Sequence, residues 1–107
     1  MVHGKEIAFI ASHYGYDAQT RQLIEEMAEL TQAINKFWRY QLDYGKKELE
    51  DVDFGTTEEK DIIEEIGDVE ICLDQIKWLL KCSTEVEVSK SEKIQREIAR
   101  IKGKNNT

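Results

Sequence analysis

The chain of 107 residues contains no proline, only two cysteines and fewer basic than acidic residues. Proline ends or kinks helices, so its complete absence favours long uninterrupted helices. No secretory signal precedes Cys72 and Cys82, so we expect reduced thiols in a cytoplasmic protein rather than a disulfide or metal pair. No apolar run approaches the roughly 20 residues that span a bilayer, which argues against a membrane protein.

The excess of acidic over basic residues limits which partners the protein can bind. Fifteen Lys and Arg stand against 22 Asp and Glu, which gives a formal charge of −7. A protein that grips a nucleic acid polymer through its phosphates presents a basic face, so this balance argues against that class. It does not exclude a small phosphorylated ligand held through a metal ion and a few local cations.

The length fits a single domain over residues 1–107, with a modest core that a partner subunit could complete. The pattern predicts an all-α, four-helix bundle-like fold. The expected segments are a short helix at 4–13 that ends near Gly15, a second helix from an Asp17 N-cap to about residue 43, a loop at 44–57, a third helix from Thr57 to about Cys82, a turn at 83–88, a last helix from Ser89 to about Gly103 and a frayed tail at 104–107. Thr56 with Glu59 and Ser89 with Glu92 have the spacing of capping boxes. The loop is long for a compact domain, which makes it a candidate lid.

Two segments repeat each other. LIEEMAEL, which starts at Leu23, aligns residue for residue with IIEEIGDV, which starts at Ile62. At about 100° per residue each copy forms an apolar stripe with acidic residues along its border. The two stripes are Leu23, Met27, Leu30 and Ile34, and Ile62, Ile66, Val69 and Leu73. Packing them together would bring four carboxylates near one another.

These four acids are Glu26, Glu29, Glu65 and Asp68. Converging carboxylates repel, so either a cation sits among them or the helices turn them out to solvent. Charge runs on helices are usually solvated faces. The second copy in matching phase favours a hard-cation site, and oxygen ligands suit Mg²⁺ or Mn²⁺ better than zinc.

The order of the motifs resembles the MazG type of all-α nucleoside triphosphate pyrophosphohydrolases. The resemblance rests on Glu25-Glu26-x-x-Glu29 followed by Glu65-x-x-Asp68, on His13-Tyr14-Gly15 leading to Gln19, and on Lys93-x-x-Arg96-x-x-x-Arg100. It covers most of residues 10–101. The spacer between Glu29 and Glu65 is longer than compact members show, so the resemblance does not name the substrate.

The resemblance implies Mg²⁺-dependent cleavage of an NTP or dNTP between the α and β phosphates, in a homodimer or homotetramer. Glu26, Glu29, Glu65 and Asp68 would be metal ligands. Glu25 would be a further ligand or the base that orients water, unless it is a solvent-facing charge. Lys93, Arg96 and Arg100 would hold phosphates, unless they only pair with Glu92 and Glu97 on an exposed helix.

Other interpretations stay open. Trp38 and Trp78 suit core or subunit-interface positions, although Asn35 or Trp38 could face a nucleobase. A non-catalytic helical interaction module would share the fold. A di-iron carboxylate bundle also collects acids inside helices, but such sites usually contain Glu-x-x-His pairs, and neither His3 nor His13 follows a Glu by three residues.

Overall fold

The computed structural model describes residues 2–43 and 55–105, and these residues form three helices and no strand. The helices are α1 (Gly4–Asp43), α2 (Thr57–Leu80) and α3 (Ser83–Asn105). The all-α prediction is therefore confirmed. None of the three helices is long and apolar enough to cross a membrane. The expected loop at 44–57, apart from its last residues, lies outside the described residues, as do residues 106 and 107 of the expected tail.

A kink divides α1 into a short arm and a long arm. Gly15 has φ 87° and ψ 172°, a conformation that costs a residue with a Cβ far more than glycine. The break expected near Gly15 is confirmed, and Ile7 and Ala11 of the short arm are buried. The N-cap expected at Asp17 is wrong, because Gly15 has the only non-helical backbone inside α1 and Asp17 already lies within the long arm.

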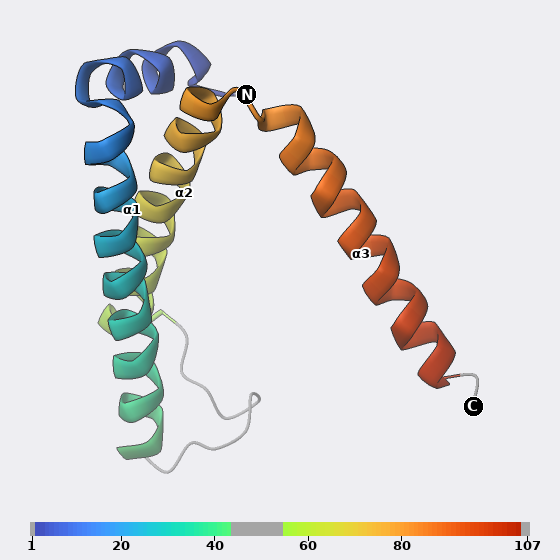
Figure 1. Cartoon of the computed structure of the whole chain (residues 1–107). Helices are drawn as coiled ribbons and strands as arrows, with labels where there is room; N and C mark the ends of the chain where they lie inside the picture. Colours follow the sequence, from blue (N-terminus) through green and yellow to red (C-terminus); the bar gives the residue numbers. More distant parts are fainter. Residues whose placement is uncertain (1, 44–54, 106–107) are drawn as a thin grey trace.

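The long arm of α1 and α2 run antiparallel and form a hairpin, and the short arm lies across the end where α2 finishes (Figure 1). The N-terminus of α2 is capped as expected. The Thr56 hydroxyl accepts from the Glu59 amide at 3.2 Å, and the Gly55 amide donates to the Glu59 carboxylate. This pair of bonds satisfies amides that the helix itself cannot pair. At the other end Lys81 has a left-handed backbone, and its amide and that of Cys82 bond back to α2.

The seam between the two helices differs from the expected stripes. On the long arm of α1, the half-buried Leu23, Glu26 and Leu30 lie between Gln19 and Ala33 and keep a spacing of three or four residues. The six buried positions of the seam are Gln19, Ala33, Phe37, Gln41, Cys72 and Gln75. Three of the six are glutamines, and Gln19 donates to Gln75 at 2.6 Å across the hairpin. Met27 and Ile66, which were expected in the core stripe, are 44% and 42% exposed. Compared with the expected stripes, the buried face of each helix therefore lies further round towards its acidic residues.

α3 departs most from the expectation. It begins at Ser83, so the predicted turn at 83–88 and the predicted helix start at Ser89 are wrong. The helix extends away from the hairpin (Figure 1) and lies near α2 only in its first half, where Lys90 lines a pocket with Glu70 and Asp74. It does not contact α1 in the part of the chain that the structure describes. The radius of gyration is 17.9 Å, against about 13 Å for a compact domain of roughly this length. The helices therefore do not close into a bundle within the single chain, and the four-helix bundle-like fold was expected to be completed by oligomerisation.

Candidate metal centre

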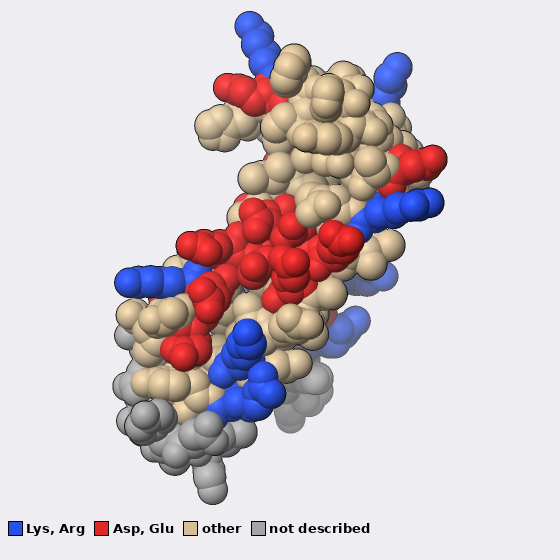
Figure 2. Space-filling view, turned by 90° about the vertical axis from the view of Figure 1, so that its left-hand side faces the viewer, with Lys and Arg blue, Asp and Glu red and all other residues tan. Residues whose placement is uncertain are grey.

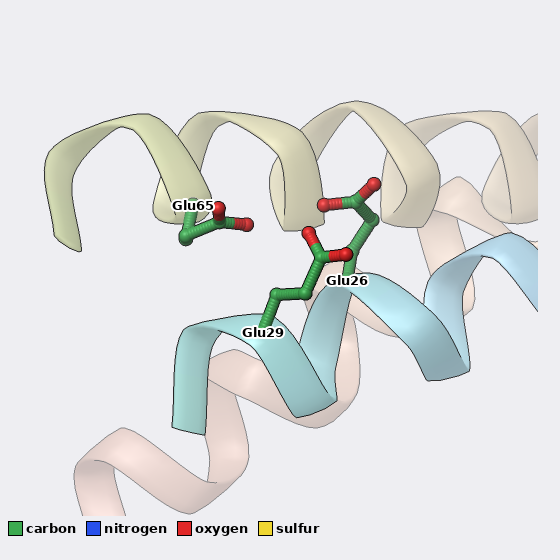
Figure 3. Close-up of side chains that lie close together, drawn as sticks. All are labelled: Glu26, Glu29 and Glu65. Carbon is green, nitrogen blue, oxygen red and sulfur yellow. The ribbon is translucent and has the colours of Figure 1, made fainter. Parts of the chain in front are cut away.

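Three acidic side chains from two helices meet between α1 and α2. Glu26 and Glu29 come from the long arm of α1, Glu65 comes from α2, and all three point into the space between the helices (Figure 3). One carboxylate oxygen from each lies within 4.8 Å of the other two. The antiparallel hairpin brings the two acidic segments of the sequence repeat face to face, as predicted.

Glu26 and Glu65 lie closer to the seam than the sequence pattern indicated. Both are half-buried, whereas Glu29 is exposed. Glu26 accepts a hydrogen bond from the Gln22 amide at 2.7 Å through Oε1, but its Oε2 is buried and has no partner. Oε2 of Glu65 is likewise buried without a partner. An unpaired buried carboxylate oxygen costs free energy, so these two atoms are poorly satisfied by the protein alone.

The electrostatics of Glu65 reflect this crowding. Its pKa is raised from the ordinary value near 4.5, first by burial and then by the charges of Glu29, Glu26 and Asp68. The pKa of the nearby Cys72 thiol is raised too, by burial and by the charges of Glu26 and Asp68. Each shift has the sign expected where negative charges meet at a partly desolvated place. A cation bound there would lower the pKa of both groups.

The donor set fits a hard divalent cation. Mg²⁺ binds oxygen at about 2.0–2.1 Å, so two ligands on opposite sides of it lie about 4 Å apart. Three oxygens around one such ion lie about 3–4 Å from one another, so the clustered oxygens, which are within 4.8 Å of one another, would move closer together to bind it. Three carboxylates leave coordination positions for water or substrate oxygens, which is how Mg²⁺ is usually held beside phosphates.

Asp68 and Glu25 lie outside this group of three. Asp68 is exposed, yet its charge acts on both Glu65 and Cys72, so it lies beside the cluster. Glu25 is exposed on α1. The cluster thus brings together three of the four expected metal ligands, with the fourth at its edge.

The predicted phosphate-binding residues are not brought to the acids within this chain. Lys93, Arg96 and Arg100 line a shallow hollow on α3, which extends away from the hairpin. The Arg100 guanidinium pairs with Glu97 on the same helix. Pairing with Glu97 on an exposed helix is the alternative to phosphate binding stated above. Because α3 extends away from the hairpin, these residues could reach the acids only from another chain or after α3 moves.

Two features of the long arm of α1 were not predicted from the sequence. Gln22 holds Glu26 in place, and the signal for it was the i, i+4 spacing of an amide and an acid. A hollow on α1 is lined by Gln32, Asn35, Lys36, Trp38 and Arg39. It contains both residues considered for a nucleobase, and it adds two cations, Lys36 and Arg39, which lie about two to three turns beyond Glu29.

The acids also dominate one face of the molecule. Asp and Glu side chains form a continuous patch across the middle of the face that is on the left in Figure 1, with Lys and Arg at its edges (Figure 2). Such a face repels anions unless cations are bound to it.

No protein-family model, curated protein or solved structure matches the chain.

Proposed function

We propose that this protein is a MazG-like, Mg²⁺-dependent pyrophosphohydrolase that converts an NTP or dNTP to the monophosphate and pyrophosphate. One observation carries the proposal: Glu26, Glu29 and Glu65 converge from two helices to within 4.8 Å, and two of their oxygens are buried without a partner. This arrangement is unfavourable for the protein alone and suits a bound divalent cation.

Each acid has a separate role in this proposal. Glu26, Glu29 and Glu65 hold Mg²⁺ (or Mn²⁺), and Asp68 at the edge of the cluster completes the set. The metal, when bound, neutralises phosphate charge and polarises the phosphoryl group. Glu25 accepts a proton from the attacking water and orients it towards the phosphate. Gln22 supports the site by fixing Glu26, to which it donates at 2.7 Å.

The substrate phosphates need cations besides the metal. Lys93, Arg96 and Arg100 lie on α3, away from the acids of their own chain. We propose a homodimer or homotetramer in which these residues reach the acids of a neighbouring copy. The guanidinium fork is well suited to bind phosphate oxygens there.

The decisive experiment assays pyrophosphate release from a panel of NTPs and dNTPs with Mg²⁺, and identifies each product. We expect release from at least one triphosphate and its abolition by Glu65→Gln. Glu64→Gln is the matched control, because it removes the same charge from the adjacent, exposed position of α2. No release from any triphosphate, with metal binding confirmed, would refute the proposal.

A helical interaction module without turnover is the second candidate. The apolar residues left exposed on the helices favour it, among them Ile24 at 64%, Ile63 at 58% and Ile94 at 55%. Isothermal titration with Mg²⁺ separates the two candidates. Equal, weak heats from the parent chain and from Glu65→Gln would favour the module.

A further inference from the structure

The short arm of α1 and the middle of α2 enclose a groove away from the acidic cluster. Its volume is about 380 Å³. Ile7, Ile10 and Ile71 line it with apolar side chains. Gly67 also lines it and has no Cβ, so no side chain separates the groove from the α2 backbone at that position. A Cβ built on Gly67 would meet no atom within 4 Å. The groove is thus open and apolar at a point where an approaching helix could lie close to the α2 backbone.

Acidic side chains border this groove. Glu6 lies on the short arm, and Glu70 and Asp74 lie on α2. Only Asp74 has an ion pair among these three in the described structure, with Lys77 at 3.1 Å. An apolar floor with an acidic rim selects a ligand that is apolar along one side and positively charged beside it.

The second half of α3 has these properties. Ile94, Ile98 and Ile101 occur at i, i+4 and i+7, so they form one stripe, and they are 55%, 47% and 51% exposed. Between positions 90 and 104 the helix carries six Lys and Arg against two Glu. α3 does not contact α1 among the described residues, so this stripe is not covered by that helix.

We infer that the groove receives α3 of a second copy of this chain. The corner between α2 and α3 disfavours docking within one copy. Only Lys81 and Cys82 separate the two helices, and their amides bond back to Trp78 and Lys77 at 3.1 Å each. This short, hydrogen-bonded corner directs the second half of α3 away from its own groove (Figure 1), and Lys90, near the corner, is the α3 residue that lines a pocket with the rim acids Glu70 and Asp74 in the described structure. In a symmetric pair each α3 would lie on the partner's groove, with its isoleucines on the apolar floor and its cations beside the acidic rim.

This contact keeps the α3 cations at the rim of the groove, so it is an alternative to the arrangement proposed above in which Lys93, Arg96 and Arg100 reach the acids of a neighbouring copy, and it does not use the acidic cluster. Its failure is therefore distinguishable from the failure of the hydrolase proposal. The first is measured as self-association and the second as pyrophosphate release.

Three variants test the contact by multi-angle light scattering at matched concentrations. Gly67→Leu fills the groove at a position with free space in the single chain, and leucine also favours the helix. Ile98→Asp charges the α3 stripe, and Ala99→Asp is its control on the same helix, about 100° further round. We expect the parent and Ala99→Asp to associate alike. The other two should associate at least tenfold more weakly, with unchanged helix content by circular dichroism.

A cross-linking experiment identifies the occupant. A photoreactive amino acid replaces Ile98, and isotopically heavy and light copies are mixed before irradiation. We expect heavy-light cross-links from position 98 to residues 2–10 or 67–74. Cross-links confined to single copies would show that α3 folds back on its own hairpin, and would overturn the inference. A monomeric parent chain, or association unchanged in both Gly67→Leu and Ile98→Asp, would overturn it as well.

Discussion

Glu65→Gln should reverse the order of stability between metal-free and metal-loaded protein. In EDTA near neutral pH the variant should unfold at a higher temperature than the parent, because it removes a charge that burial and three neighbouring acids disfavour, as the raised pKa of Glu65 shows. With Mg²⁺ the parent should become the more stable of the two. One substitution would then have opposite effects under two conditions, which a simple packing change cannot produce.

The size of the reversal follows from linkage. Mg²⁺ at 100 times its dissociation constant stabilises the parent by about 2.7 kcal/mol. For a domain of this size that corresponds to a rise in Tm of roughly 10–20 °C. Loss of one of three clustered carboxylates should weaken binding at least tenfold. The same Mg²⁺ concentration then adds at most about 1.4 kcal/mol to the variant.

The assay is thermal unfolding by circular dichroism at fixed protein concentration, with EDTA or with Mg²⁺. Glu64→Gln serves as the control, since it removes an equal charge beside the cluster. Its response to Mg²⁺ should match that of the parent. The reasoning would be refuted by equal Mg²⁺-induced shifts in the Glu65 and Glu64 variants, or by a parent chain that Mg²⁺ does not stabilise.

Three further predictions concern the pH response, the seam and the helix cap. The pKa of Glu65 in the folded protein is above its ordinary value near 4.5. The free energy of unfolding of the metal-free protein, measured in urea, should therefore fall as the pH rises from 4.5 through the raised pKa. Glu65→Gln should reduce this dependence on pH. Gln75→Leu should lower the free energy of unfolding in urea by about 1–3 kcal/mol, because the buried Gln19 amide loses its hydrogen-bond acceptor. Adding Gln19→Leu should restore much of that free energy. A double variant no more stable than Gln75→Leu would contradict this. Thr56→Ala should cost about 1 kcal/mol by the same measurement, because the Glu59 amide loses its partner, whereas Thr57→Ala should cost less.

Local signals in the sequence were sufficient for several features. The capping box at Thr56 depends on side chains three residues apart, and it formed as predicted. The break near Gly15 depends on one residue that tolerates positive φ. The meeting of the Glu26 and Glu65 segments depends on a repeat in phase on two helices joined as a hairpin.

Competition between local signals was harder to resolve. Ser89 with Glu92 has the same capping spacing as Thr56 with Glu59, yet Ser89 lies inside α3. The helix began earlier because Ser83 follows directly on the left-handed corner at Lys81, where the chain had already turned. A capping pattern marks where a helix can begin, and it does not prevent an earlier start.

The sequence by itself determined that the described residues fold as helices and that two acidic segments match in phase, because periodicity, capping and the absence of proline act within a few residues. Only the tertiary structure decided which side of each helix is buried. It placed Glu26 and Glu65 beside a seam of glutamines and small residues and left Met27 and Ile66 exposed. It also directed α3 away from the hairpin. Both outcomes depend on contacts between residues distant in the chain, whose free energies no local pattern contains.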